Sequence, residues 1–433
     1  MTEVVATNQT IVVVGGGISG MTAALEAAEC GKQVILLEKN PALGGRVSQM
    51  YKYFPKMCHP TCGMEINLRR IKANSNIRVM TMAEVTNVSG DTGDYTLNVT
   101  VQPRYVNENC TACGACRDAV ETEFDNEFNY GLNKRKGAYL TSNMAYPQRY
   151  VIDPRMIGTA DADKAKAACK YDAVDLDMQA EDLEIKAGSI VWATGWRPFD
   201  AAKIQPYGYD RIANVITSVE LERMMDPMGP TGGKILRPSD GKEAKDIAFI
   251  QCAGSRDRNY LKHCSRICCM ASLKQTTYLR EKYGDDGKAT VYYIDIRAID
   301  RFEDFYQKVQ ADDNVSFIKS KVASVTEDKA TGNPVLNGNN LEQSGMGKDM
   351  RYANPHELVV LAVGMEPSVD FNALNVGLSV NEEGFIERDP GNGGMFAAGC
   401  AADALDVNRA VQSATASSLR AIQVVNQVAG AEG

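Results

Sequence analysis

The chain has 433 residues, of which 44% are hydrophobic and 24% charged, and its formal net charge at pH 7 is −8. This composition predicts a globular protein of two or three domains and excludes a disordered chain. The negative net charge gives no sign of the basic surface that binds nucleic acid. The sequence contains no run of about 18 apolar residues, so it predicts no transmembrane helix. The opening "MTEVVATNQT" lacks the basic and apolar regions of a signal peptide, so we expect a cytoplasmic chain.

The cysteine content is unusual. Twelve cysteines accompany only three histidines. In a chain of this size without a signal peptide, clustered thiols indicate metal or redox chemistry rather than disulfides. Cys30 stands alone on a predicted helix, where we expect a buried small apolar side chain. The other eleven cysteines fall into groups.

The first elements predict a dinucleotide site. The stretch "TIVVVGGGISGMTAALEAAECGKQVILLEKN" combines a β-branched run, a glycine-rich turn, a helix and a second apolar run. In G-x-G-x-x-G, helix amides can bind a pyrophosphate, and an acid at the end of the second strand can bind a ribose. The residues predicted to contact the dinucleotide are Gly15, Gly17, Ile18, Ser19, Gly20, Glu38 and Lys39.

Three further segments resemble those of the two-dinucleotide-binding-domain flavoproteins, which include glutathione and thioredoxin reductases. They are "LGGR" at 43–46, "VWATGWRP" at 191–198 and "GGMFAAGCA" at 393–401. The resemblance implies an α/β fold with an FAD domain and a second Rossmann-like domain. Cys400 stands where this class usually has an aspartate for the ribityl chain. The FAD contacts that the resemblance implies are Gly44, Gly45, Arg46, Ala193, Thr194, Gly195, Gly399 and Cys400.

"CHPTC" holds Cys58, His59 and Cys62. A structural zinc would need a fourth ligand that is not nearby. Disulfide reductases of this class carry a redox cysteine pair after the "GG" segment, so a dithiol that faces the flavin is one alternative for this pair. We favour a partner-facing or structural pair.

"CTACGACRDAV" is an incomplete ferredoxin run. A bacterial run reads C-x2-C-x2-C-x3-C-P, and the first three thiols are present at Cys110, Cys113 and Cys116, whereas the fourth position holds Val120. In two-cluster ferredoxins, the last cysteine of each run serves the other cluster. A missing fourth ligand is therefore expected downstream.

"ACKYDAVDLD" supplies that ligand at Cys169. Counting back by the same spacing, the other three positions of a second run hold Thr159, Ala162 and Ala165, none of which can bind iron. We therefore predict one 4Fe-4S cluster in an inserted ferredoxin-like segment, against the alternative of a decayed insert. Its ligands are Cys110, Cys113, Cys116 and Cys169.

The second half has the skeleton of another Rossmann-like unit: a strand "DIAFIQC", a helix to about Tyr283, a strand "TVYYIDIR" and a closing "LVVLAVGMEP". The glycine fingerprint is replaced by "CAGSRDRNYLKHCSRICCMASLKQ". Four thiols at the carboxyl end of a strand predict a metal site, although one of two adjacent cysteines could be a core thiol. They are Cys252, Cys264, Cys268 and Cys269.

"QCAGSRD", "CSRICCM" and "ATGWRPFD" resemble the corresponding segments of the A-type flavoprotein of heterodisulfide reductase, and the likeness extends along nearly the whole chain. That resemblance implies a second 4Fe-4S cluster near FAD, held by these four cysteines. Without the extra ferredoxin segments of the methanogen protein, the chain also resembles the A-type flavoprotein (QmoA) of the quinone-interacting membrane-bound oxidoreductase complex of sulfate reducers. This likeness implies electron transfer between menaquinol and adenylylsulfate reductase, at the inner membrane, with two partners: a haem-bearing membrane subunit plus a second flavin/iron-sulfur subunit.

Alternatives remain at this point: a heterodisulfide-reductase-like protein serving hydrogenase or thiol-disulfide partners, an NAD(P)H-dependent disulfide reductase, and a scaffold with degenerate sites. We expect His263 and His356 to be polar surface residues. The predicted organisation is an FAD domain in three parts (1–105, 181–243 and 366–433), the inserted segment (106–180) and a second Rossmann-like domain (244–365).

Overall fold

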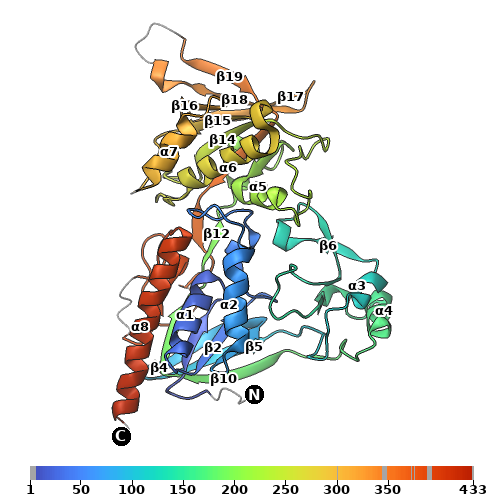
Figure 1. The fold of residues 1–433 in the computed structure, drawn as a ribbon, viewed down its shortest axis with the longest axis vertical. Helices are drawn as coiled ribbons and strands as arrows, with labels where there is room; N and C mark the ends of the chain where they lie inside the picture. The colour runs from blue at the N-terminus through green and yellow to red at the C-terminus, as the bar shows by residue number, and fades with distance from the viewer. Residues whose placement is uncertain are drawn as a thin grey trace.

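The computed structural model describes residues 6–299, 301–343, 349–371, 373–374, 376–387 and 393–431. Two α/β units are stacked one above the other, and the inserted segment lies to one side of the lower unit (Figure 1). Both marked ends of the chain lie at the lower end of the molecule.

The lower unit contains a five-stranded parallel sheet of order β22-β11-β1-β2-β3. The β-branched and leucine-rich runs form its buried central strands, as the sequence predicts. Alanines on α1 are fully buried and allow close packing against the long C-terminal helix α8. The elements are β1 (Ile11–Val14), α1 (Ile18–Glu29), β2 (Val34–Glu38), η1 (Gly45–Gln49), α2 (Thr61–Ala73), β3 (Ile77–Thr81), β11 (Ser189–Trp192), β22 (Met395–Ala397), η8 (Gly399–Ala401) and α8 (Val407–Ala431).

An antiparallel sheet of order β10-β5-β4 connects the lower unit to the inserted segment. Strands β5 and β10 pair from Val101↔Glu181 to Tyr95↔Ala187, so the chain leaves and re-enters the sheet at neighbouring points. The segment between them packs around its own apolar cluster. The elements are β4 (Ala83–Asp91), β5 (Asp94–Val101), α3 (Ala115–Ala119), β6 (Glu123–Asp125), β7 (Lys134–Lys136), β8 (Ala138–Tyr139), β9 (Val151–Ile152), α4 (Ala160–Ala168) and β10 (Glu181–Ala187).

The upper unit has a second parallel sheet of order β13-β20-β14-β15-β16, with a three-stranded antiparallel sheet above it. The two-stranded ribbon β12-β21 joins the units. The elements are β12 (Trp196–Pro198), β13 (Val215–Thr217), α5 (Ser218–Met225), β14 (Asp246–Ala253), α6 (Cys268–Tyr283), β15 (Lys288–Tyr293), α7 (Phe302–Gln310), β16 (Val315–Lys319), β17 (Ser324–Asp328), β18 (Asn333–Asn339), β19 (Arg351–Pro355), β20 (Leu358–Val363) and β21 (Met365–Pro367).

Two single-residue expectations are wrong. Cys30 is exposed rather than buried, because α1 ends at Glu29 and Cys30 forms its C-cap. His356 is only 6% exposed, because its ring bonds to Asp246 at 2.9 Å and to the Tyr292 hydroxyl at 3.0 Å. Polar partners inside the upper unit make its burial tolerable.

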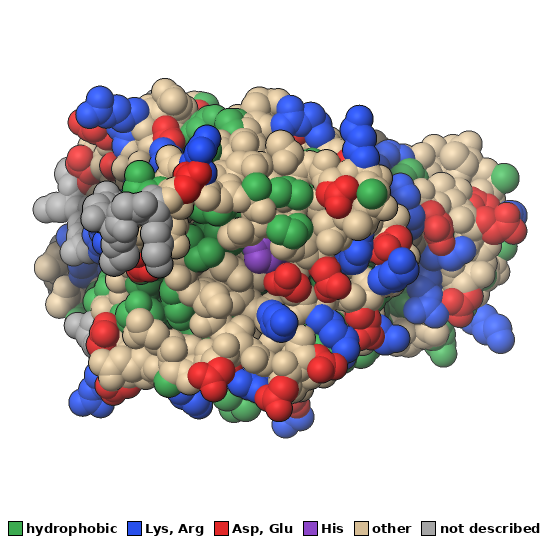
Figure 2. Space-filling view, turned by 90° about the horizontal axis from the view of Figure 1, so that it is seen from above, with side chains coloured by type: hydrophobic (Ala, Val, Ile, Leu, Met, Phe, Trp, Pro, Cys, Tyr) green, Lys and Arg blue, Asp and Glu red, His purple; other side chains and the backbone are tan. Residues whose placement is uncertain are grey.

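The outer surface mixes charges of both signs. Seen from above, Lys and Arg side chains lie among Asp and Glu side chains without a large area of one sign (Figure 2). Over the described ranges, none of the helices combines the length and the apolar character needed to cross a bilayer.

Candidate functional site

The principal cavity of the lower unit opens at the carboxyl ends of β1, β2 and β11, the usual ligand edge of a parallel α/β sheet. Its volume is about 840 Å³. The wall continues onto the first turns of α6 and α8 and onto the inserted segment, so three parts of the chain enclose one space.

The glycine turn leaves room for a ligand at one position only. Gly15 has φ +111°, and a Cβ on Gly20 would lie 1.7 Å from the Gly15 carbonyl oxygen, so close packing requires glycine at both positions. A Cβ on Gly17, by contrast, would meet no protein atom nearer than 3.8 Å. Gly17 starts α1 without any side-chain cap. The free helix amides and the open space fit a pyrophosphate.

Glu38 lies at the end of β2 and is 6% exposed. One carboxylate oxygen accepts from the Gly16 amide at 2.6 Å, and the other accepts from the Asn40 amide at 2.7 Å. Burial raises the pKa of Glu38, while these hydrogen bonds act in the opposite direction. The acid is thus fixed beside the glycine turn, where a ribose would lie.

Twelve of the fifteen residues predicted to contact FAD line the cavity: Gly15, Gly17, Ile18, Ser19, Glu38, Lys39, Gly45, Arg46, Ala193, Thr194, Gly195 and Cys400. The other three, Gly20, Gly44 and Gly399, do not line the cavity but permit close packing, Gly20 against the Gly15 carbonyl and the other two against serine side chains. Lys39 is exposed and pairs with Glu84 at 2.7 Å. The Arg46 guanidinium reaches the Trp196 carbonyl at 3.2 Å and the Tyr130 hydroxyl at 3.2 Å.

The loop after β11 also fits a polar ligand. The Thr194 hydroxyl is buried without a hydrogen-bond partner, and a Cβ on Gly195 would meet no protein atom within 4 Å. Ser368 fixes this loop by donating to the Thr194 carbonyl at 2.5 Å. A bound FAD would fill this open space and would supply the hydrogen bond that the buried hydroxyl lacks.

Cys400 is a buried thiol of the cavity wall. Burial raises its pKa to about 12, and its Sγ lies 3.4 Å from the Leu405 carbonyl oxygen. It is therefore a neutral thiol at pH 7, which cannot replace the charge of an aspartate. Among the described residues 400–410 that line the cavity, the acid is Asp406, whose Oδ1 accepts from the Arg409 amide at 3.0 Å in the first turn of α8.

The structure brings Cys252, Cys264, Cys268 and Cys269, the sheet-edge thiol set, close together, although none of the four lines the cavity itself. Cys252 is the last residue but one of β14 and has φ +57°, and α6 begins at Cys268. The pKa of Cys268 is raised by burial first and then by the charges of the other three thiols. Burial raises the pKa of Cys269 to about 11. Met270 and Ala271, which follow directly, line the cavity.

The inserted segment brings Cys110, Cys113, Cys116 and Cys169, the insert thiol set, together as well. Burial raises the pKa of Cys116 to about 11, with further contributions from the other three thiols. Backbone amides of Ala112 and Ala173 point at the sulfurs of Cys110 and Cys169, at 3.4 and 3.3 Å. Such N–H···S contacts are typical of iron–sulfur ligands.

Residues that could not bind iron, two of them in the apolar core, stand where a second cluster would need its ligands. Ala162 and Ala165 are 0% exposed and pack with Val120 and Met156. Thr159 caps α4 by accepting from the Ala162 amide at 3.4 Å. The inserted segment therefore has an apolar core where its second cluster would lie, and one set of four thiols beside it.

A single metal ion does not fit these thiols. In the part of the chain that the structure describes, no three His, Cys, Asp or Glu side chains lie close enough to share one ion. A four-iron cube is wider than an ion and accepts a wider set of thiols. The donor chemistry, grouped cysteine sulfurs with amide N–H contacts at Cys110 and Cys169, fits iron–sulfur clusters.

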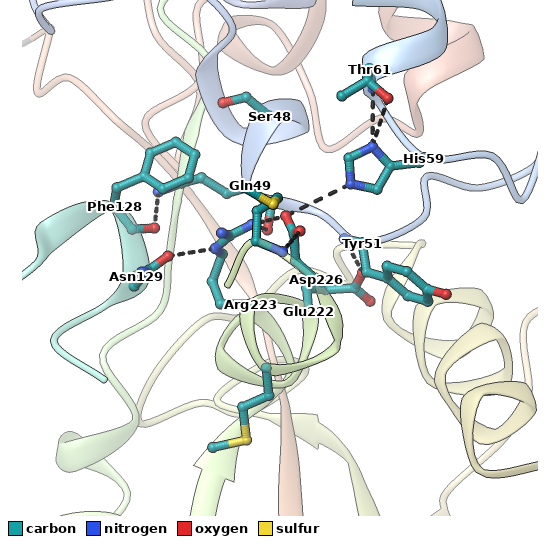
Figure 3. A network of polar contacts seen from close by, with 12 residues as sticks. Ser48, Gln49, Tyr51, His59, Thr61, Phe128, Asn129, Glu222, Arg223 and Asp226 are labelled. Carbon is teal, nitrogen blue, oxygen red and sulfur yellow. Dashed lines mark hydrogen bonds and ion pairs between the residues drawn. The ribbon is translucent and has the colours of Figure 1, made fainter. Parts of the chain in front are cut away.

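Cys58 and Cys62 do not line the cavity, and both are exposed. Their loop is fixed from beneath, because the His59 ring bonds to the Thr61 hydroxyl at 2.9 Å and faces Asp226 at 3.7 Å (Figure 3). A flavin-facing dithiol is therefore not what the geometry shows.

Beneath that loop lies a buried polar junction that the sequence did not reveal. Arg223 of α5 is 2% exposed and donates to Asp226 at 2.7 Å and to Asn129 of the inserted segment at 2.8 Å (Figure 3). Glu222, its neighbour, pairs with Lys274 of α6 at 2.7 Å. Lys274 is 3% exposed and lines the cavity. A charged residue on a helix is usually solvated, so no local pattern marked these residues.

The sequence reasoning also missed the contribution of the inserted segment to the cavity. Arg135 has a side chain only 10% exposed, pairs with Asp153 at 3.0 Å and stacks on Tyr139. A tertiary contact of this kind has no sequence signal. The wall residues of this segment are Asn126, Glu127, Phe128, Arg135, Tyr139, Thr141, Ser142, Asp153, Pro154 and Arg155.

Comparison with known proteins agrees with this geometry. Residues 10–112 match the family of FAD dependent oxidoreductases. The chain is 37% identical to one of the iron-sulfur A subunits of CoB–CoM heterodisulfide reductase in Methanopyrus kandleri, over 94% of this chain and 63% of that protein. It is 35% identical to the A subunit of the H2:CoB-CoM heterodisulfide, ferredoxin reductase of Methanothermobacter marburgensis, over 96% of this chain and 64% of that protein. The chain thus spans a little under two thirds of these relatives' length.

Solved structures show the same fold. Thioredoxin reductase of Lactococcus lactis aligns with a TM-score of 0.53 at 14% identity, covering 97% of this chain and 99% of that one. The bacillithiol disulfide reductase of Bacillus cereus aligns with a TM-score of 0.51 at 14% identity, also over 97% and 99%. The predicted class, a two-dinucleotide-binding-domain flavoprotein, is confirmed.

Proposed function

Because the chain is an oxidoreductase component with this flavoprotein fold and is similar to heterodisulfide reductase A subunits along nearly all of its length, we propose that it carries electrons between FAD and two 4Fe-4S clusters within a heterodisulfide-reductase-like complex. Partner subunits deliver or accept these electrons. Thiol-disulfide and hydrogenase partners are the chemistry that the relatives favour.

One observation carries the proposal. The first turn of α6 holds Cys268 and Cys269 and continues into Met270 and Ala271, which form the cavity wall. A cluster on the sheet-edge thiol set would therefore adjoin the FAD cavity without an intervening element. The insert thiol set, by contrast, lies in a segment with its own core and includes the exposed Cys113.

The chain's residues have separable tasks in this proposal. Gly17 and the α1 amides receive the pyrophosphate, Glu38 the ribose, and Thr194 the buried polar edge of the ligand. Lys274, paired with Glu222 at 2.7 Å, forms part of the cavity wall on α6. Bound FAD would supply the exchange between electron pairs and single electrons.

The link to menaquinol, adenylylsulfate reductase and a haem-bearing membrane partner in sulfate respiration remains a prediction from sequence resemblance. The relatives reported above are heterodisulfide reductase subunits, which makes that alternative the better supported one. A cytoplasmic position at the inner membrane is likewise a proposal. An NAD(P)H-dependent disulfide reductase is disfavoured, because Cys58 and Cys62 lie outside the cavity and cysteines replace the second glycine turn.

A reductive titration tests the proposal. The anaerobically reconstituted chain should take up about four electrons from dithionite, two for FAD and one for each cluster. Uptake of about two electrons would mean that only the flavin is redox-active. NADH and NADPH in place of dithionite should leave the flavin absorbance unchanged on the same timescale, and rapid bleaching would favour the disulfide reductase.

A further inference from the structure

Gln251 is a buried amide without a hydrogen-bond partner. Its side chain is 4% exposed, and neither the amide nitrogen nor the amide oxygen bonds to another described residue. Nearly all buried polar groups in folded proteins are hydrogen-bonded, and leaving one unpaired is unfavourable. Among the described side chains with an unpartnered buried atom, Gln251 is the one that has two. It stands directly before Cys252, a member of the sheet-edge thiol set.

Gln251 lies on the face of β14 that α6 covers. Successive side chains of a strand point to opposite faces of the sheet, so Ile247, Phe249 and Gln251 share one face. Ile247 and Phe249 pack in one apolar cluster with Tyr278 and Leu279 of α6. Gln251 continues this row toward the carboxyl end of β14, beneath the part of α6 that precedes Tyr278.

The start of α6 adjoins the same end of β14. Cys268, the first residue of α6, has its Sγ 3.5 Å from the Val363 carbonyl oxygen, and Val363 pairs with Ala253 of β14. The register of this pairing shifts just before Ala253, where Cys252 has φ +57°. Gln251 therefore lies where Cys252 and Cys268 come together.

Ser272 of α6 adds a second unpartnered group at this end of β14. It is 0% exposed, and its hydroxyl has no hydrogen-bond partner among the described residues. Residues four apart share one face of a helix and their side chains tilt toward its N-terminus, so Ser272 leans toward the turn that holds Cys268. Thr276 and Thr277 differ, because each donates to a carbonyl of the preceding turn, at 2.8 and 2.6 Å.

The sulfurs of an iron–sulfur cluster are the acceptors that suit these two donors. Such sulfurs accept hydrogen bonds, and the bonds they receive help to set the reduction potential of the cluster. Bound FAD is a less suitable acceptor, because neither Gln251 nor Ser272 lines its cavity. A buried water molecule is the remaining candidate, and it would leave the potential independent of these side chains.

We propose that the Gln251 amide and the Ser272 hydroxyl donate hydrogen bonds to sulfur atoms of a cluster on the sheet-edge thiol set and thereby raise its reduction potential. A donor stabilises the reduced cluster more than the oxidised one, because reduction adds negative charge to the acceptor. Burial strengthens the effect, since water does not compete for the donors. The inference rests on the proposed function, because it requires a cluster at these four cysteines.

The test is a redox titration of the reconstituted, FAD-loaded chain followed by electron paramagnetic resonance, with the sheet-edge cluster identified as the signal lost in Cys268→Ser. Gln251→Met keeps the length of the side chain but removes its donors. It should move the reduction equilibrium of this signal about tenfold toward the oxidised form, or about 59 mV lower for a one-electron couple. Ser272→Ala should shift it in the same direction by less, because a hydroxyl supplies one donor. Thr276→Val is the matched control on α6, since its buried hydroxyl already donates to Leu273 and should cause no shift.

The outcomes distinguish the role of these donors from the proposed function. A wild-type chain without a signal that Cys268→Ser removes would overturn the proposed function. A wild-type signal whose potential is unchanged in Gln251→Met would overturn only the inference and would assign the amide to a buried water. An equal shift in Thr276→Val would also contradict it, because loss of any buried polar group would then have the same effect. If Gln251→Met loses the cluster, Ser272→Ala decides: a lowered potential supports the inference, and an unchanged one contradicts it.

Discussion

The two thiol sets have the same number of cysteines but opposite surroundings. The sheet-edge set lies where β14 meets α6, beside the cavity and beside the ion pair between Arg256 and Asp295, at 2.7 Å. The insert set lies against an apolar core, with Cys113 exposed. Since solvent exposure and neighbouring charge set cluster potentials, the two sets should differ in potential and in access to partners. In the proposed function, a cluster on the first set would exchange electrons with the flavin, and a cluster on the second with a partner at the protein surface.

The largest expected effect is loss of the bound flavin. In Gly20→Ala, the new Cβ would lie 1.7 Å from the Gly15 carbonyl oxygen, so the turn cannot keep its shape and FAD content should fall at least about tenfold. Iron on the insert thiol set should remain. Flavin and iron analysis of the purified protein measure both. The control is Gly31→Ala, where a Cβ meets nothing within 4 Å and FAD should stay bound.

Breaking the insert set should leave the flavin untouched. Cys169→Ser should lower the iron content by about one atom, if a three-iron cluster survives, or by about four, if the whole cluster is lost. FAD content should not change, because Cys169 lies outside the cavity wall. Cys30→Ser, at an exposed helix end, serves as the control and should lose no iron. Equal iron in both variants would mean that this set binds no cluster.

Breaking the sheet-edge set should affect the flavin as well. Cys268→Ser should remove up to about four iron atoms and also shift the visible absorbance of the bound FAD, because the first turn of α6 forms part of the cavity wall. The insert signal in electron paramagnetic resonance should persist. A flavin spectrum identical to that of the wild type would argue against direct contact between the two sites.

A smaller effect should come from the ion pairs within the inserted segment, at the part that lines the cavity. Burial acts to raise the pKa of Asp153, but hydrogen bonds from Arg155 at 2.7 Å and Arg135 at 3.0 Å outweigh it and lower the pKa to about 2. This carboxylate stabilises the fold above its unfolded pKa of about 4, and the contribution is lost as pH falls through about 2.

Asp153→Asn should therefore lower the free energy of unfolding by about 2 kcal/mol at pH 7, and by progressively less between about pH 4 and pH 2. Urea unfolding of both proteins across this range measures the difference. A deficit that stays constant down to pH 2 would show that the loss is not electrostatic.

The sequence predicted most of the scaffold because local chemistry determines it. The glycine turn, the first two strands and the β14–α6–β15 unit have patterns that alone specify a strand, a turn or a helix. That Cys110, Cys113 and Cys116 lie together was also predictable, since cysteine spacing in ferredoxins is a local property, while cluster binding at these thiols stays a prediction.

The sequence could not predict what depends on tertiary contact. Arg104, Arg223 and Lys274 look like solvated charges in the chain, and only the packing of distant segments buries them. His356 appeared to be a surface residue for the same reason, as its partners Asp246 and Tyr292 lie far away in sequence. The cavity wall contributed by residues 126–155 likewise depends on how the inserted segment docks.

The central claim is that one chain holds FAD and two separate four-iron clusters. Its most direct test is the ratio of iron and acid-labile sulfide to FAD in the anaerobically reconstituted chain. We predict about eight iron and eight sulfide per FAD, from two clusters of four. About four of each would leave only one of the two thiol sets with a cluster, and an FAD-loaded protein without iron would contradict the claim.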